Sequence, residues 1–233
     1  MIPREHRAGL VKAAEAALPE GKREVAQGIE KMLSDAASFS SADSGQEGAV
    51  VSFIAHCTFP NAVEVQHLMD AVLKVGPHAK YSYFERHVHS EEAGITVVPK
   101  SKIELAEGAE FKTEFELLKG RVGVMDIDYD ALCAAKSRLD MTARIYARGK
   151  DRIKMREAAR LAGEGAVGVL TSHLAVRDDA SAEIYNELIA EAAGARGHVD
   201  CKEIVQDRGS ARAIPIVSVN HPLAHVTHEA AIG

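Results

Sequence analysis

A short corner of small residues recurs along the chain at a nearly constant interval. It takes the forms Gly163–Ala166, Asp178–Ala180, Ala193–Ala195 and Gly209–Ala211. Counted on the alanines at positions 166, 180, 195 and 211, successive corners are separated by steps of 14, 15 and 16. The step between the earlier corners at Ala79 and Ala109 is twice that interval. A unit that repeats at a fixed period predicts a solenoid, in which each coil stacks on the coil before it.

The segments between the corners alternate in polarity or are rich in β-branched and aromatic residues, as strands are. Examples are Val50–Ile54, Lys80–Phe84, Phe111–Leu117 and Val122–Met125. The spacing leaves no room for the crossover helix of a βαβ unit, and the sequence has no Asn-Gly hairpin signal. We therefore predict a mainly β fold, a parallel β-helix with two strand-corner units per turn, and an antiparallel sandwich remains the alternative.

One segment conflicts with this prediction. Residues 180–193 (ASAEIYNELIAEAA) favour a helix by local propensity, although the corners on either side keep the period. A strand there requires that tertiary contacts override propensity.

The N-terminal part has a different pattern. Leu10, Ala13 and Ala17 recur at helical spacing, and residues 38–45 are small and polar, as in a linker. We predict N-terminal helices and a linker over residues 1–45 and a β-helix core over residues 46–233.

Composition excludes several classes of function. The net charge is −6, from 28 basic and 34 acidic residues, so a basic face for nucleic acid is not expected. No apolar run is long enough to cross a bilayer, and three widely spaced cysteines favour a reducing, cytoplasmic location. The sequence has neither a GxxxxGK[ST] motif nor a nucleophile elbow, so we expect a chain that is not an enzyme and binds no nucleotide.

The C-terminal end gathers residues that can bind metals, namely Cys201, His228 and Glu229, with His221 and His225 nearby. Thiolate, imidazole and carboxylate together can ligate zinc, iron or an iron–sulfur cluster. The separation of Cys201 and His228 is close to one coil, so stacking could bring them together. The alternative is that Cys201 is a small buried apolar residue and the histidines are solvated.

Cys57 follows His56, and a neighbouring imidazole can favour the reactive thiolate. The alternative is core packing. Cys133 has no notable polar neighbour and is expected to be structural. His78, His87, His89 and His173 are expected to cap corners or to face solvent.

Two blocks of the sequence resemble the SufB/SufD family. The C-terminal block comprises Val199–Ile204, Arg212–Ile216 and Val226–Gly233, and it is similar to the signature that ends in a histidine–glutamate pair in B-type members. The upstream block spans residues 56–84, around Cys57 and a proline. The sequence does not include the long N-terminal extension of bacterial B-type members, and it stops at Gly233, where the family usually continues into helices that dock on the ATPase. We therefore expect either a shortened chain or a form that resembles the short archaeal-type systems with one scaffold subunit.

The resemblance implies a right-handed parallel β-helix that assembles an iron–sulfur cluster with a SufC-type ABC ATPase partner. It implies that Cys201, His228 and Glu229 take part in cluster formation and that Cys57 accepts sulfur from a donor. Our hypothesis is a [4Fe–4S] or nascent cluster at a homodimer interface, or in a B/D-type heterodimer, before transfer to apo-protein recipients. The alternative is a D-like structural subunit that binds no cluster, and Glu229 argues against it because D-type members have glycine there.

Overall fold

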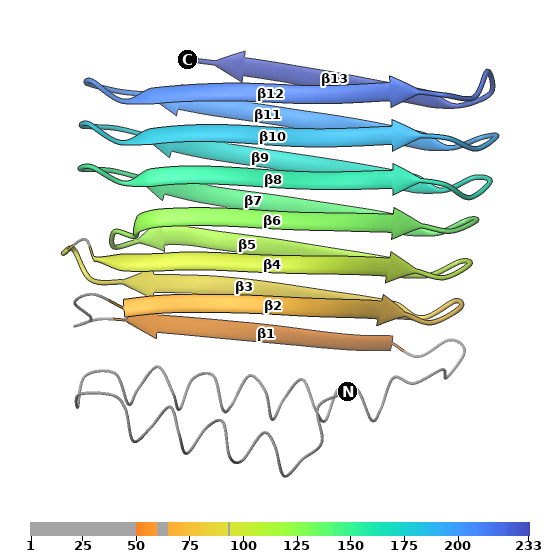
Figure 1. Cartoon of the computed structure of the whole chain (residues 1–233), viewed down its shortest axis with the longest axis horizontal. Helices are drawn as coiled ribbons and strands as arrows, with labels where there is room; N and C mark the ends of the chain where they lie inside the picture. Colours follow the sequence, from red (N-terminus) through yellow and green to blue (C-terminus); the bar gives the residue numbers. More distant parts are fainter. Residues whose placement is uncertain (1–49, 60–64, 93) are drawn as a thin grey trace, which may run out of the picture. The chain divides into compact units, whose positions relative to one another are not determined.

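The computed structural model (Figure 1) describes residues 50–59, 65–92 and 94–233. Within these ranges the chain forms strands and corners and no helix, and none of the described residues belongs to a helix that could cross a bilayer. The helices expected over residues 1–45, and the boundary after them, lie outside the described residues. The strands are β1 (Val50–Phe59), β2 (Val65–Val75), β3 (Lys80–His89), β4 (Ile95–Leu105), β5 (Glu110–Lys119), β6 (Gly123–Cys133), β7 (Arg138–Ala147), β8 (Arg152–Leu161), β9 (Val167–Val176), β10 (Ser181–Ala190), β11 (Arg196–Val205), β12 (Ser210–Val219) and β13 (His225–Ile232).

The strands form two parallel sheets. One sheet has the order β1-β3-β5-β7-β9-β11-β13 and the other β12-β10-β8-β6-β4-β2, so successive strands alternate between the sheets. In Figure 1 the strands of one sheet all run one way and those of the other sheet run back. Val50 pairs with Lys80 and Arg138 with Val167, so one coil spans twice the interval between corners. The predicted parallel β-solenoid with two units per turn is confirmed, and the antiparallel sandwich is excluded.

The core lies between the two sheets. Along β9 and β10 every second residue is buried, because successive side chains of a strand point to opposite faces. Leu139, Met141, Ile145, Met155 and Leu170 are among the largest side chains that are fully buried. Each such burial stabilises the fold by about 1.5–3 kcal/mol.

Strand β10 shows tertiary contacts overriding local propensity. Its residues favour a helix, yet they pair in register with β8 on one edge and β12 on the other. Ile184 and Leu188 then enter the core at 0% exposure, while Glu183 and Glu187 stay on the outer row. A helix at this position would leave the ladder groups of both neighbouring strands unpaired, which costs more than the lost propensity.

The small corners are explained by close stacking of one coil on the next. A Cβ added at Gly163 would lie 1.9 Å from the backbone nitrogen of Ala135 in the preceding coil. Asp151 braces another corner, because its fully buried carboxylate accepts hydrogen bonds from the backbone N–H groups of Gly123 and Arg148. A corner residue must therefore be small where the next coil passes close to it, or must accept hydrogen bonds from the N–H groups of the turning backbone.

Candidate functional site

The interior of the solenoid contains polar side chains as well as the apolar core. Burying such groups is unfavourable unless they are hydrogen-bonded or bind a ligand, so they are candidates for function. The buried polar residues among those described are His67, Glu85, His87, His89, Thr113, Ser137, Asp151, Glu157, Ser172, Asn186 and Glu203.

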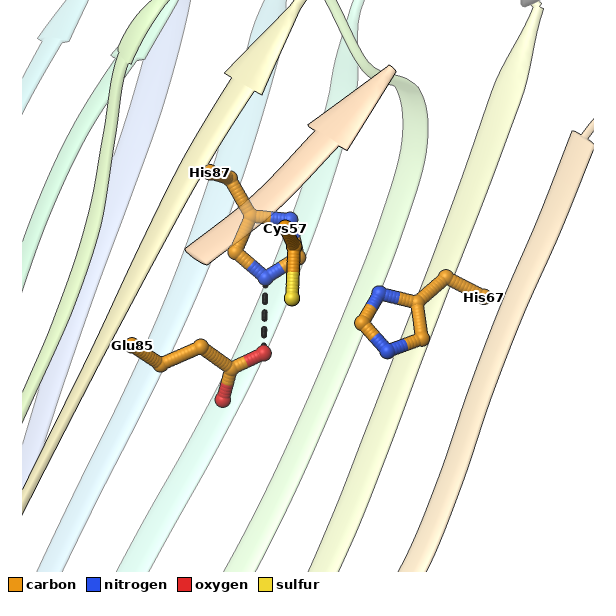
Figure 2. Close-up of side chains that lie close together, drawn as sticks. All are labelled: Cys57, His67, Glu85 and His87. Atoms are coloured by element: carbon orange, nitrogen blue, oxygen red, sulfur yellow. Dashed lines mark hydrogen bonds and ion pairs between the residues drawn. The ribbon is translucent and has the colours of Figure 1, made fainter. Parts of the chain in front are cut away.

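Four buried residues at the N-terminal end of the described solenoid form a cluster that we call the tetrad: Cys57, His67, Glu85 and His87. One ligand atom from each lies within 4.8 Å of those of the other three. Cys57 of β1 and His87 of β3 are register partners in adjacent coils, and Glu85 precedes His87 by two positions on the same inward row. His67 comes from β2 in the opposite sheet, and Figure 2 shows its ring turned toward Cys57 and His87.

The hydrogen bonds around His87 fix its orientation. Its Nε2 lies 2.7 Å from Oε1 of Glu85, and its Nδ1 lies 3.1 Å from Nε2 of His89. The Nδ1 of His89 lies 3.2 Å from the carbonyl oxygen of Arg121, which can only accept a hydrogen bond. His89 therefore carries its proton on Nδ1 and, when neutral, accepts the Nδ1–H of His87.

Burial controls the protonation of these groups. Desolvation lowers the pKa of His89 to about 4 and lowers the pKa of His67, so both rings are neutral near pH 7. Burial alone would raise the pKa of Glu85, but hydrogen bonds from His87 and Tyr83 and the nearby imidazoles outweigh it, and the pKa lies below its usual value. Desolvation raises the pKa of the Cys57 thiol to about 12.

His67 has an unused donor or acceptor in this cluster. Its Nδ1 is buried and has no hydrogen-bond partner among the described residues. The ring stacks on His87, with centroids 5.3 Å apart, and packs at a tilt against Phe59 at 5.7 Å. The ring is thus held by its faces while one nitrogen is left available.

The backbone is irregular beside the tetrad. The pairing of β3 with β5 shifts register between His87 and Val88, as at a β-bulge. Gly120, in the coil above, has φ +82° and comes so close that a Cβ there would lie 2.0 Å from the carbonyl oxygen of His89. Bulges re-aim side chains and are common next to functional sites.

A column of buried polar groups continues from this end of the solenoid. Tyr129, Glu157 and Asn186 are successive register partners in β6, β8 and β10. Burial raises the pKa of Tyr129, and the nearby charges of Glu85 and Glu157 raise it further. Burial with no hydrogen-bonded partner for Oε2 raises the pKa of Glu157 to about 8.

The column ends at Cys201. Nδ2 of Asn186 lies 2.6 Å from Oγ of Ser172 and 3.6 Å from Sγ of Cys201. Cys201 of β11 is fully buried between its register partners Ser172 and Ala230, and burial raises the pKa of its thiol to about 12.

The structure places His228 and Glu229 on β13, the strand next to Cys201. Their register partners are Val199 and Asp200, so Glu229 belongs to the outer row while Cys201 points inward. Glu229 is exposed and forms an ion pair with Lys202 at 3.5 Å. Coil stacking thus makes the predicted residues neighbours in the sheet, and their role as ligands stays a prediction.

Sequence analysis missed part of the tetrad. His67 and Glu85 were not singled out, and His87, expected to cap a corner or face solvent, is instead buried at 1% exposure. A signal was present, because the separation of Cys57 and His87 equals one full coil, the same step as from Ala79 to Ala109. In addition, Glu85, His87 and His89 alternate on one row of a strand, which is unusual for a core face.

No protein-family model matches the chain. Three curated proteins do, all named iron–sulfur cluster assembly SufBD family protein. The one from Methanocaldococcus jannaschii is 36% identical over 81% of this chain and 60% of its own length, and the one from Pyrococcus horikoshii is 32% identical over 80% and 57%. The third, from Archaeoglobus fulgidus, is 25% identical over 81% of this chain and 50% of its own.

The chain therefore spans between half and three fifths of the length of these relatives. Their similarity covers four fifths of this chain, and its described part has the parallel β-solenoid that the sequence resemblance implied. The chain belongs to the SufB/SufD family of iron–sulfur cluster assembly proteins.

Proposed function

We propose that this chain is a scaffold subunit on which an iron–sulfur cluster, [4Fe–4S] or nascent, is built and then passed to apo-protein recipients. The names of the three relatives support a role in iron–sulfur cluster assembly. In this proposal the scaffold works in the cytoplasm with a SufC-type ABC ATPase, which hydrolyses the ATP.

One observation carries the proposal beyond the family name: a column of buried polar groups lies between two buried thiols. Cys57 is on β1 and Cys201 on β11, near opposite ends of the same sheet, and Tyr129, Glu157 and Asn186 lie between them in the other sheet. A solenoid that served only as a rigid spacer would gain stability from apolar residues at these positions.

In the proposed reaction, sulfur enters at Cys57. The Cys57 thiolate attacks the outer sulfur of a donor persulfide, R–S–SH, which gives Cys57–S–SH and releases R–S⁻, so no external oxidant or reductant is needed. Because burial holds the Cys57 thiol protonated, the step requires that the donor or a neighbouring base removes its proton.

The cluster would form at the Cys201 end. A single thiolate per chain, helped by His228 or Glu229, holds a cluster less tightly than four thiolates, which suits a cluster that must be released. A homodimer with a two-fold axis doubles this ligand set, because the same patch occurs on both subunits. Since Cys201 points inward beneath β13, cluster binding requires that this terminal strand moves.

Anaerobic reconstitution with ferrous iron and sulfide tests the cluster site. We expect the wild type to gain iron, acid-labile sulfide and visible absorption and to run as a dimer. The Cys201→Ser variant should lose most of this signal. Cys133→Ser is the matched control, because Cys133 is another fully buried thiol whose pKa burial raises to about 12. Equal iron and sulfide in the wild type and Cys201→Ser would refute the role of Cys201.

The second candidate is a D-like subunit that completes the assembly complex and binds no cluster. The burial of the Cys201 thiol and the ion pair of Glu229 with Lys202 favour it. This candidate predicts that neither the wild type nor Cys201→Ser gains iron and sulfide, although both are folded.

A further inference from the structure

We propose that the tetrad of Cys57, His67, Glu85 and His87 binds one divalent transition-metal ion of the Zn²⁺ or Fe²⁺ class. The ion would be held by one sulfur, two nitrogens and one oxygen. This site is separate from the cluster site at Cys201 and does not depend on the assembly role.

The donor set fits this class of ion. Zn²⁺ in proteins is bound by thiolate, imidazole and carboxylate ligands, nearly always four in a tetrahedron. Hard ions such as Mg²⁺ and Ca²⁺ prefer all-oxygen sites and are disfavoured by a thiolate and two imidazoles. Because all four ligands come from the protein and all are buried, the site would be closed to substrate, as structural metal sites are.

The distances are close to those of an occupied site. Bonds of about 2.0–2.3 Å in a tetrahedron place neighbouring ligand atoms about 3.3–3.6 Å apart. The four ligand atoms lie within 4.8 Å of one another, so they need to move inward by about 1 Å at most. The 2.7 Å contact between Glu85 and His87 would open by less than about 1 Å as both atoms turn to the ion.

The unpartnered nitrogen of His67 is the observation that points to a ligand. His67 is 5% exposed, and its buried Nδ1 finds no partner among the described residues. Figure 2 shows this ring facing the Cys57 sulfur and the His87 ring. Buried polar atoms in native proteins nearly always have a hydrogen-bond or metal partner. A ring nitrogen without one that points into a cluster of metal-binding groups therefore indicates that the cluster binds a metal ion.

The surroundings of His87 are those of a metal ligand. Its Nδ1–H donates to Nε2 of His89, whose own Nδ1–H donates to the carbonyl oxygen of Arg121. This relay assigns Nδ1 of His87 as the donor to His89, so Nε2 is the nitrogen that would bind an ion, once it gives up the proton that it shares with Glu85 at 2.7 Å. Metal-bound histidines typically donate their second N–H in this way, which fixes the tautomer and the ring orientation.

Because the occupied site would be closed to substrate, Cys57 would accept sulfur only after the ion has left. A coordinated thiol is deprotonated, and the thiolate is the form that accepts sulfur.

The test is a Co²⁺ titration of the 233-residue chain under argon without sulfide, in a Cys201→Ser background that removes the other proposed metal-binding thiol. We expect one Co²⁺ per chain, thiolate-to-cobalt charge-transfer absorption in the near ultraviolet and the intense visible bands of tetrahedral Co²⁺. Adding Cys57→Ser should abolish the charge-transfer band. Adding Cys133→Ser, a matched buried thiol outside the tetrad, should leave it unchanged.

A second variant, His67→Phe, tests the same site in case Cys57→Ser disturbs the fold. His67→Phe keeps a ring against Phe59 and His87 and removes no hydrogen bond of the described structure. We expect its circular dichroism to match the parent and its Co²⁺ affinity to fall by at least about tenfold. At the same Zn²⁺ concentration, the melting temperature of His67→Phe should rise less than that of the parent.

Three results would overturn the inference: no charge-transfer band in the folded parent, a band that survives Cys57→Ser, or unchanged affinity in His67→Phe. Failure of iron and sulfide reconstitution with normal Co²⁺ binding would count against the cluster scaffold alone. Normal reconstitution without Co²⁺ binding would count against the tetrad alone.

Discussion

Glu157 is a fully buried carboxyl group whose Oε2 has no hydrogen-bond partner among the described residues. Burial raises its pKa from 4.5 in the reference state to about 8 in the folded chain. Because the folded pKa is the higher one, the folded chain holds this proton more tightly than the unfolded chain. The stabilisation is complete below about pH 4.5 and is lost progressively as the pH rises to about 8.

The magnitude follows from these two values. Each pKa unit corresponds to about 1.36 kcal/mol, so the full shift amounts to roughly 5 kcal/mol. Between pH 5 and pH 8 the wild type should lose roughly 3–4 kcal/mol from this group alone. Glu157→Gln cannot ionise, so it should be the more stable protein at pH 8, and its advantage should shrink by that amount at pH 5.

Urea unfolding at pH 5, 6.5 and 8, followed by far-ultraviolet circular dichroism, measures the difference between the two proteins. Other ionisable groups titrate in both proteins and cancel in the comparison. Glu164→Gln, which removes an exposed carboxylate from a corner, is the control and should change stability by less than about 0.5 kcal/mol at any pH. A difference between the wild type and Glu157→Gln that stays constant from pH 5 to pH 8 would refute the reasoning.

Three further predictions concern the corners, the core and the thiols. Asp151→Ala leaves buried corner N–H groups without an acceptor, so we expect a loss of about 3 kcal/mol in the free energy of unfolding, measured by urea denaturation. Gly197→Ala would place its Cβ 2.4 Å from a methyl of Leu188, so we expect it to lower the free energy of unfolding by about 1–3 kcal/mol. The double variant with Leu188→Ala should lose less free energy of unfolding than the two single variants lose together. Strictly additive costs would contradict this contact. Burial raises the pKa of the Cys133 thiol from 9.0 to about 12, so its alkylation by iodoacetamide at pH 8 should be about 10³-fold slower in the native chain than in urea. Peptide mass mapping measures both rates, and equal rates would contradict the burial of this thiol.

The candidate site was only partly predictable. Cys57 could be identified because a cysteine beside a histidine is a local feature of the sequence. His87 could have been found with it, since the spacing is one coil. His67 could not, because it lies in the other sheet, and its meeting with Cys57 depends on how the two sheets face each other across the core.

The C-terminal prediction shows the same limit. Coil length placed His228 and Glu229 on the strand beside Cys201, as expected. A shift of one position in a strand reverses the face of a side chain, so register decided that Glu229 lies outside and Cys201 inside.

The amino-acid sequence by itself favoured the solenoid over an antiparallel sandwich, because small corners and alternating strands that repeat at a nearly constant interval are typical of stacked coils, and the parallel strand pairing then excluded the sandwich. The sequence also determined that β10 lies within that repeat, since the flanking corners kept their period. Only the tertiary structure decided which inward side chains meet, because contacts across the core join residues from different sheets and coils with no fixed separation in sequence. The tetrad is such a contact: its members become neighbours only when two sheets and two coils close around them.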